Sequence, residues 1–352
     1  MALWVDKHRP RSLQALSYHP KITARLRALA VGGDFPHLLV YGASGVGKKT
    51  RIIAALKELY GPGVNKIKVD SRVFQTSSNR KLEFNVVSSI YHMEITPSDM
   101  GNNDRVIIQE LLKEVAQTQQ VDLSAKKRFK VVIINEADSL TRDAQAALRR
   151  TMEKYSPNLR LILIANTTSN IIAPIRSRTL LMRVPAPDEP QIVSILQGIA
   201  KKERVALPPV LAERLAHDSG RNLRKAVLML EAVVAQTEKL ADDTAIPPPD
   251  WEVVIASVVD DVIQEHSAQR LMKVRAKFYE LLSHCIPPEV VLKTLLFKLL
   301  PRVDPDLRAE IIHWAAFYEH RLHLGSKAIF HLEAFVAKVM RMMEAYVMGL
   351  GL

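Results

Sequence analysis

The residues with the clearest chemistry form a glycine-rich loop near the N-terminus. The loop consists of Gly42, Ala43, Ser44, Gly45, Val46, Gly47 and Lys48, and it matches the first seven positions of the P-loop pattern. Glycines let the backbone curl so that successive N–H groups point at phosphate oxygens, and the next helix adds the positive end of its dipole. Lys48 is expected to neutralise the β- and γ-phosphates of a nucleotide. The loop predicts a nucleotide site; the alternative is a strand–helix turn without a ligand.

One position of the loop departs from the pattern. The residue after the lysine is normally Ser or Thr, whose hydroxyl ligates Mg²⁺, but here it is Lys49, with Thr50 following it. A shift of one residue turns a helical side chain by about 100°, so Thr50 cannot simply substitute. An ammonium group near the metal position also repels a cation. The sequence therefore predicts weak or absent Mg²⁺ binding.

A second motif departs in the same direction. The apolar run 131–134 is followed by Asn135, Glu136, Ala137 and Asp138, where a Walker B strand ends in Asp-Glu. Glu136 stands in the place of the water-activating base, while Asn135 replaces the metal-supporting Asp, and Asp138 is not in register to replace it. We expect the site to bind ATP or ADP and to hydrolyse ATP slowly or not at all, which makes Glu136 a vestigial base.

The elements that must position these residues alternate along the first half of the chain. Short apolar runs at 36–42, 131–134 and 161–164 are typical of buried parallel strands. Helical stretches are expected at 50–60, 104–118 and 141–154. This alternation predicts an α/β fold with a parallel sheet covered on both faces. Residues 71–100 interrupt it and indicate an inserted hairpin.

Strand signals stop after Arg183. Three prolines mark a hinge, and helices are expected at about 190–202, 208–217 and 221–236. A second break at 245–249 precedes helical patterns that continue to about residue 347. We therefore expect three domains: a nucleotide-binding α/β domain at 1–183, a helical lid at 184–245 and an all-α collar at 246–352.

Composition narrows the function classes. The 352 residues carry a net charge of +12, and the single cysteine, Cys285, excludes an intrachain disulfide. Residues 1–183 hold 29 Lys and Arg against 15 Asp and Glu, so the basic excess lies in the half that contains the loop. Such a field attracts nucleic acid or nucleotide phosphates. No apolar run is long enough to span a bilayer, and no secretory signal is visible, so we expect a soluble intracellular protein.

Several further motifs give the chain a family resemblance. They are Trp4-Val5-Asp6-Lys7-His8-Arg9-Pro10, Ala147-Leu148-Arg149-Arg150-Thr151-Met152-Glu153, Ile175-Arg176-Ser177-Arg178, Asn222-Leu223-Arg224 and Leu324-Gly325-Ser326-Lys327-Ala328-Ile329. With the loop and the Asn135 strand, they make the chain resemble the small subunits of the eukaryotic sliding-clamp loader, replication factor C, of the AAA+ class. The resemblance covers nearly the whole chain.

The resemblance implies roles for individual residues. Val5, Arg9 and the region of Leu16 are expected on the adenine side of the nucleotide. Asn166 is implied as the sensor 1 residue and Arg224 as sensor 2, both near the γ-phosphate. Arg178 is implied as an arginine finger that enters the site of a neighbouring subunit, where a guanidinium is worth roughly 10³–10⁵ in rate in GTPase examples.

The resemblance also implies partners. They are the other subunits of a heteropentameric loader, the sliding clamp and primer–template DNA, in the nucleus, for replication and repair. Arg105, Gln109 and Lys113 recur at i, i+4 and i+8 and form one helix face, which the family places along DNA; Arg80 and Lys81 are weaker additions. Ser98 or Asp104 is expected to cap this helix.

Two other functions remain open on sequence alone. A self-sufficient AAA+ motor, such as a branch-migration helicase, requires the metal residues that Lys49 and Asn135 replace. A scaffold with an empty phosphate loop requires no nucleotide. An alternative loader for checkpoint or cohesion work shares the same small subunits, so the sequence does not separate it from the replicative one.

Overall fold

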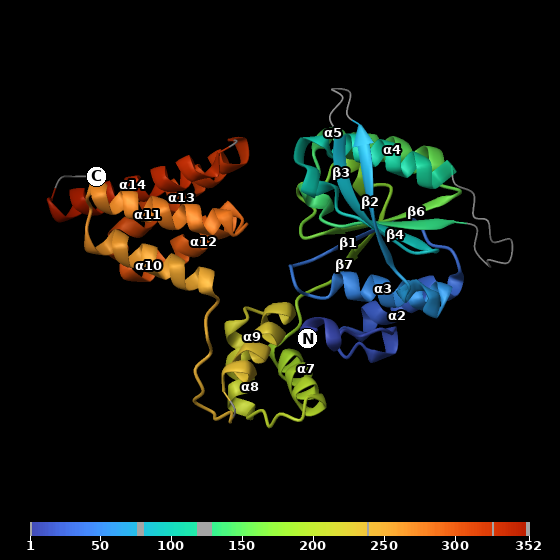
Figure 1. The fold of residues 1–352 in the computed structure, drawn as a ribbon, viewed down its shortest axis with the longest axis horizontal. Helices are drawn as coiled ribbons and strands as arrows, with labels where there is room; N and C mark the ends of the chain where they lie inside the picture. Colours follow the sequence, from blue (N-terminus) through green and yellow to red (C-terminus); the bar gives the residue numbers. More distant parts are fainter. Residues whose placement is uncertain (1, 76–80, 118–128, 238, 326, 350–352) are drawn as a thin grey trace. The chain divides into compact units, whose positions relative to one another are not determined.

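The chain forms two compact units, Met1–Ile246 and Pro247–Leu352. The structure is a computed structural model that describes residues 2–75, 81–117, 129–237, 239–325 and 327–349. The first unit contains a seven-stranded sheet with flanking helices and a separate cluster of three helices, whereas the described part of the second unit is helical (Figure 1). The unit boundary falls at the start of the proline run 247–249.

The sheet has the strand order β2-β3-β4-β5-β6-β1-β7. Its strands are β1 (Leu38–Tyr41), β2 (Lys68–Gln75), β3 (Lys81–Ser88), β4 (His92–Ile95), β5 (Lys130–Ile134), β6 (Leu159–Ala165) and β7 (Leu180–Arg183). The five strands from β4 to β7 in this order run parallel to their neighbours, while β2 and β3 pair antiparallel at one edge. The sheet is therefore mixed, with a parallel majority.

The hairpin expected within 71–100 is present, but it is not separate from the sheet. It begins earlier, at Lys68, and its second strand pairs with β4, so it extends the same sheet. Its apolar pattern is one-sided: Phe84 and Val86 on β3 are buried, whereas Val69 and Val73 on β2 are exposed. A strand buried on one face gives a weaker sequence signal than the doubly buried central strands.

Helices cover both faces of the sheet because the central strands carry buried apolar side chains on both of their faces. Leu39 packs in the core formed with α4 (Asp104–Gln117) and α5 (Arg142–Tyr155). Its neighbours Leu38 and Val40 pack in the opposite core, with α2 (Pro20–Gly32) and α3 (Lys48–Tyr60). Figure 1 shows these helix pairs on opposite sides of the strands. The predicted three-layer α/β fold is confirmed.

Three helices form a smaller core after the sheet. They are α7 (Glu189–Lys202), α8 (Pro209–Asp218) and α9 (Leu223–Gln236), packed through residues such as Leu196, Leu215 and Leu230. Trp4 and Val5, from the short helix α1 (Trp4–Lys7), pack against this core. The start of the chain thus contacts the helical cluster as well as the sheet domain.

The second unit is a helical bundle with its own core. Its helices are α10 (Asp250–Gln264), α11 (Ala268–Ser283), α12 (Pro288–Leu299), α13 (Pro305–Leu324) and α14 (Ala328–Val347). Val258, Phe278, Leu295, Ile311 and Phe335 illustrate its fully apolar interior. Within the part of the chain that the structure describes, no helix combines the length and apolarity needed to cross a bilayer.

Candidate nucleotide site

The phosphate loop lies where β1 ends and α3 begins, the strand–loop–helix context that the pattern requires. Gly45 and Gly47 have φ values of 75° and 82°, in the left-handed region that favours glycine. A Cβ on Gly45 would lie 1.8 Å from the side-chain oxygen of Asn222, and one on Gly47 would lie 2.4 Å from the Tyr18 hydroxyl. The loop is therefore packed closely against a lid residue on one side and a residue of the N-terminal segment on the other.

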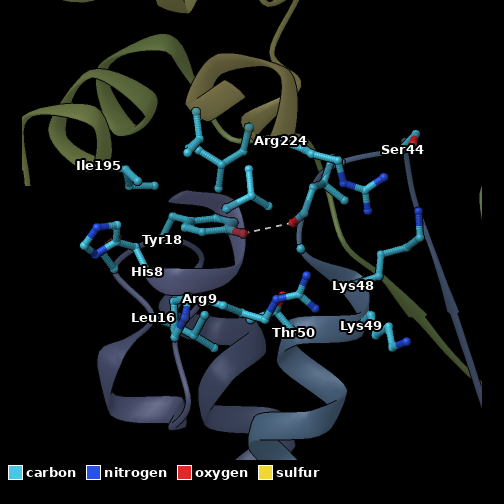
Figure 2. A pocket seen from close by; sticks show the side chains of 18 of the residues that line it. His8, Arg9, Leu16, Tyr18, Ser44, Lys48, Lys49, Thr50, Ile195 and Arg224 are labelled. Atoms are coloured by element: carbon cyan, nitrogen blue, oxygen red, sulfur yellow. Dashed lines mark hydrogen bonds between the residues drawn. The ribbon is translucent and has the colours of Figure 1, made fainter. Parts of the chain in front are cut away.

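A cavity of about 690 Å³ opens beside this loop. Figure 2 shows its walls: His8, Arg9 and Leu16 from the N-terminal segment, Ser44 and Lys48 to Thr50 from the loop and α3, and Ile195 and Arg224 from the lid helices. Of the predicted nucleotide residues, those that line it are Val5, Arg9, Leu16, Ser44, Gly45, Val46, Gly47, Lys48, Lys49, Thr50, Asn166 and Arg224. Its size and concave, mixed apolar and cationic lining suit a small anionic ligand.

Gly42 and Ala43 contribute through their carbonyl groups instead. The Lys48 ammonium donates hydrogen bonds to the carbonyl oxygens of Gly42 (2.6 Å) and Ala43 (2.8 Å) and to Oδ1 of Asn166 (3.0 Å). Burial lowers the pKa of Lys48, with the charge of Asp138 opposing the shift and that of Arg224 adding to it. Lys48 thus binds one predicted sensor residue, Asn166, and lies close enough to the other, Arg224, for the two charges to interact.

Lys49 does not point freely into the cavity. Its ammonium lies 2.5 Å from Oε2 of Glu94, a residue of β4 that is 6 % exposed. Burial alone raises the pKa of Glu94, but hydrogen bonds and charges from His92 and Lys49 outweigh it and hold that pKa below its ordinary value. The residue that breaks the P-loop pattern is therefore the partner of a buried carboxylate.

The end of β5 places its polar residues along the same wall. Asn135 donates its amide to Oγ1 of Thr96 (3.3 Å), and the carboxylate of Glu136 accepts a hydrogen bond from Ser98 (3.1 Å). Asn135 and Glu136 line the cavity together with Thr96. Both motif residues are thus beside the loop, and their side chains are engaged by the segment that follows β4.

Asp138 supports the end of the neighbouring strand β6. Its Oδ2 accepts hydrogen bonds from the backbone N–H groups of Asn166 (3.0 Å) and Thr167 (3.3 Å). This contact fixes the turn that presents the Asn166 side chain to Lys48. Asp138 therefore positions the predicted sensor 1 residue and does not stand in for the Walker B Asp, in agreement with its register.

The residues of this site give a poor fit to Mg²⁺. The hydroxyl that ligates the metal is replaced by an ammonium, and the anionic supporter is replaced by the neutral Asn135. Among the described residues there is no cluster of three or more His, Cys, Asp or Glu side chains suited to a metal ion. A nucleotide fits the lining better, because Lys48 and Arg224 give the cavity cationic side chains that suit phosphates.

Tyr18 is a cavity residue that the sequence pattern did not identify. Its hydroxyl donates to the carbonyl of Val46 in the loop (2.9 Å), drawn as the dashed line in Figure 2. The Arg51 guanidinium lies 4.5 Å from the Tyr18 ring centroid and donates to the Tyr18 carbonyl (2.7 Å) and to Thr23 (2.9 Å). Arg51 is 0 % exposed, so this contact holds the N-terminal segment firmly against α3.

The lid side of the cavity was also only partly predicted. Arg224 was expected there, but Ile195, Ile199 and Val227 line it as well. The lid is tied to the N-terminal segment by the Glu203 carboxylate, which pairs with both Lys7 and His8, and those contacts lower its pKa. Apolar lid positions give no distinct signal in the sequence, since they share the period of ordinary core residues.

Arg178 lies outside this cavity. It follows α6 (Ala173–Arg176), is exposed, and pairs with Glu153 of α5 (2.7 Å) while donating to the carbonyl of Pro174 (3.0 Å). Arg176 is exposed beside it. The predicted finger is thus not a residue of this chain's own nucleotide site.

The predicted DNA-facing helix has the expected two faces. Arg105, Gln109 and Lys113 on α4 are exposed, while Ile108 and Leu112 are fully buried. Arg80 lies outside the described residues; Lys81 begins β3, and its side chain also lies outside them. The α4 stripe is exposed, as a surface for a polyanion requires.

The predicted cap of α4 is wrong. The Asp104 carboxylate accepts hydrogen bonds from the N–H (2.7 Å) and hydroxyl (2.8 Å) of Thr141, the N-cap of α5, and Ser98 is engaged with Glu136. Both side chains therefore bind distant parts of the fold. Tertiary contacts have replaced the local hydrogen bonds that the sequence favours.

Family models match three successive parts of the chain. A model described as "DNA polymerase III, delta subunit" matches residues 18–188, one described as "RCF1/5-like, AAA+ ATPase lid domain" matches 194–235, and one described as "Replication factor C subunit 3, C-terminal domain" matches 251–347. The three follow the order of sheet domain, lid helices and helical bundle.

Curated relatives are similar over the full length. Replication factor C subunit 5 of Neurospora crassa is 67% identical and covers 100% of both chains. Replication factor C subunit 3 of mouse is 54% identical, covering 98% of this chain and 97% of its own, and subunit 5 of Saccharomyces cerevisiae is 52% identical, covering 97% and 99%.

A solved structure supports the fold alone. A single-residue variant of RuvB from Thermotoga maritima matches with a TM-score of 0.50 at 15% identity, covering 77% of this chain and 85% of its own. The specific statement comes from the full-length relatives: with their level of identity and coverage, this chain belongs to the replication factor C family.

Proposed function

We propose that this chain is a small subunit of the ATP-dependent clamp loader that opens the sliding clamp and places it on primer–template DNA during replication and repair. The family relationship supports a place in a multi-subunit complex, and the AAA+ fold supports nucleotide binding. Within that complex the chain holds adenine nucleotide at a site with little capacity for hydrolysis and supplies Arg178 to a neighbouring subunit. A replication factor works on chromosomal DNA, so its location is the nucleus.

The observation that carries this proposal is that the phosphate-binding cavity and the predicted arginine finger lie at separate places in one unit. The cavity holds Lys48, Asn166 and Arg224, which bind and sense phosphates, but it lacks the metal-supporting residues. Arg178 is exposed, pairs with Glu153 and does not line this chain's own cavity. A subunit arranged in this way keeps nucleotide for structure and assists hydrolysis in trans.

The chain's own residues suggest how the site works. Arg9 and Leu16 with Val5 form the nucleobase side of the cavity, and the loop N–H groups with Lys48 bind the phosphates. Arg224, in the first turn of α9, lets the lid respond to the terminal phosphate. Glu136 can hold a water, but without an anionic supporter at position 135 the charge that develops during hydrolysis is poorly stabilised.

Reconstitution with partner subunits tests the trans role. Loss of the Arg178 guanidinium is expected to slow hydrolysis at the neighbouring site by about 10³-fold or more, so Arg178→Ala complexes lose that site's share of ATPase activity and load the clamp poorly. Arg72→Ala is a matched control, because Arg72 also forms an exposed ion pair with a glutamate, Glu114. Unchanged ATPase and loading in the Arg178→Ala complex would refute the assignment.

Two assays on the isolated chain separate the alternatives. A self-sufficient motor would turn over ATP steadily and lose that activity with Lys48→Ala, whereas we expect no such turnover. A scaffold with an empty loop would release no adenine nucleotide on denaturation and would not bind added ADP. We expect ADP binding that Lys48→Ala weakens.

A further inference from the structure

A buried carboxylate beside the phosphate loop belongs to none of the sequence motifs. Glu94 is on β4, paired in register with Ile133 of β5, and is 6 % exposed. Removing a carboxylate from water is costly unless a cation and hydrogen bonds replace the lost solvation. The structure therefore has to provide Glu94 with positive partners.

Lys49 provides the cation, and His92 lies beside the other carboxylate oxygen. The Lys49 ammonium is 2.5 Å from Oε2, and Nε2 of His92 is 3.8 Å from Oε1. His92 is itself 3 % exposed, and its other ring nitrogen is 2.7 Å from the hydroxyl of Ser89, which fixes the ring. The pKa of Glu94 is held low by these partners despite its burial, which keeps the carboxylate anionic.

The Lys49–Glu94 pair lies where the P-loop pattern has its metal-binding residues. Lys49 is in the first turn of α3, at the place of the metal-ligating hydroxyl, and its side chain must reach β4 to contact Glu94. Lys49 lines the cavity together with Thr96 and Asn135, which follow the ends of β4 and β5. In the P-loop pattern the hydroxyl and the Walker B Asp hold the metal between these elements. Here an aliphatic stem and an anchored ammonium occupy that side of the site.

The two departures from the pattern are also balanced in charge. In the P-loop pattern the Asp adds anionic support to the hydroxyl and the nucleotide phosphates that hold the ion, so a site that no longer holds the ion has less need of the Asp. This chain has the neutral Asn135 at that position and a lysine whose charge is already paired by Glu94. The Lys49 side chain is 41 % exposed and lines the cavity, whereas the Glu94 side chain is only 6 % exposed, so the lysine is the accessible member of the pair.

We propose that the Lys49–Glu94 pair takes the place of the hydroxyl–metal pair, so that a nucleoside diphosphate or triphosphate binds here without a divalent cation. Glu94 is the positioning residue, because its Oε2 holds the Lys49 ammonium at the metal side of the site. His92 lies beside the other carboxylate oxygen, Oε1, and helps to hold Glu94 in place. This inference rests on the proposed nucleotide binding. It adds the named ion pair and the independence of binding from metal.

The test compares the affinity of the full chain for a fluorescent ADP in buffer with Mg²⁺ and in buffer with EDTA. The two dissociation constants are expected to agree within about threefold, and a loss of more than about tenfold on chelation overturns the proposal. No binding in either buffer refutes the proposed nucleotide function itself, so the two failures are distinguishable.

A double variant tests whether the pair is responsible. Lys49→Thr with Glu94→Gln removes both charges together and restores a hydroxyl, so binding should become at least about tenfold tighter with Mg²⁺ than with EDTA. Arg72→Thr with Glu114→Gln removes another ion pair of the same unit and should leave the ratio near one. A ratio near one in the Lys49 and Glu94 variant overturns the proposal.

A single variant gives a second route if the double variant does not fold. Asn135→Asp restores the Walker B carboxylate but leaves the Lys49–Glu94 pair in place. The proposal requires its binding of fluorescent ADP to remain insensitive to EDTA. Metal-dependent binding by Asn135→Asp would show that the missing Asp, and not the ion pair, excludes the metal.

Discussion

Substitution of Gly45 by alanine should separate the backbone requirement of the loop from its contact with the lid. The backbone at Gly45 is left-handed, with φ of 75°, and a Cβ there would lie 1.8 Å from the Asn222 side-chain oxygen. That oxygen also accepts a hydrogen bond from the N–H of Lys225 and so caps α9. Gly45→Ala therefore strains the loop and also displaces a helix cap.

The two costs can be estimated separately. A non-glycine residue in the left-handed region costs about 1–2 kcal/mol, and loss of an Asn cap costs about 1 kcal/mol. Gly220 is the matched control, because its φ is 59° and no atom lies within 4 Å of an added Cβ. Gly220→Ala should show the backbone cost alone, about 1–2 kcal/mol, against about 2–3 kcal/mol for Gly45→Ala.

Calorimetry of the full chain measures the difference in melting temperature between Gly45→Ala and Gly220→Ala. The transition to compare is the one whose melting temperature rises when ADP is added. For a unit of this size 1 kcal/mol corresponds to about 2–4 °C, so Gly45→Ala should melt about 2–4 °C below Gly220→Ala. An Asn222→Gly background removes the clash while costing only a few tenths of a kcal/mol of capping. In it, the penalty of Gly45→Ala should fall by about 1 kcal/mol. Strictly additive costs in the two variants would refute the proposed loop–lid contact.

Three further outcomes are expected. The pKa of Glu94 in the folded protein lies below the ordinary 4.5. The stability that its ionised carboxylate contributes is therefore present above pH 4.5 and is lost as the pH falls through the folded pKa. In acid titrations of the unfolding free energy, Glu94→Gln should lack this pH-dependent contribution. Thr141→Ala, which removes the N-cap of α5, should lower the urea stability by about 1–2 kcal/mol. In the assembled complex, Arg105→Ala and Lys113→Ala should each reduce the salt slope of DNA binding by about 1, whereas Gln109→Ala should leave the slope unchanged.

The central strands and most helices could be predicted because their signals are local. The run 161–164 lies within β6 and 131–134 within β5, since strands buried on both faces are apolar at every position. Helix α2 was not predicted, because its buried residues are few, Thr23, Leu26 and Ala30. Strand β7 was missed because it lies at the sheet edge and buries only Met182.

The lining of the cavity could be predicted where a motif marks it. Asn166, Arg224 and the loop residues 44–48 all line one cavity, while their roles toward a nucleotide stay predictions. Tyr18 and Glu94 were not predicted, because each acquires its role from a contact far away in sequence. A glutamate in the short segment 92–95 indicates a solvent-facing position when it is read locally, and its partners Lys49 and His92 make its burial tolerable.

The N-terminal segment shows why long-range contacts decide how this cavity is held together. Trp4 packs on the lid core, and its backbone N–H donates to the Glu231 carboxylate. Tyr18, fourteen positions along the chain, donates its hydroxyl to the loop carbonyl of Val46. The same short stretch therefore holds both walls of the cavity, and its own residues Arg9 and Leu16 form a third wall. Because the segment is fastened at both ends, any displacement of the lid relative to the loop must strain or break one of these contacts. Under the proposed function, a nucleotide that contacts both the loop and the lid adds a further connection between these two walls, so its structural role does not require hydrolysis.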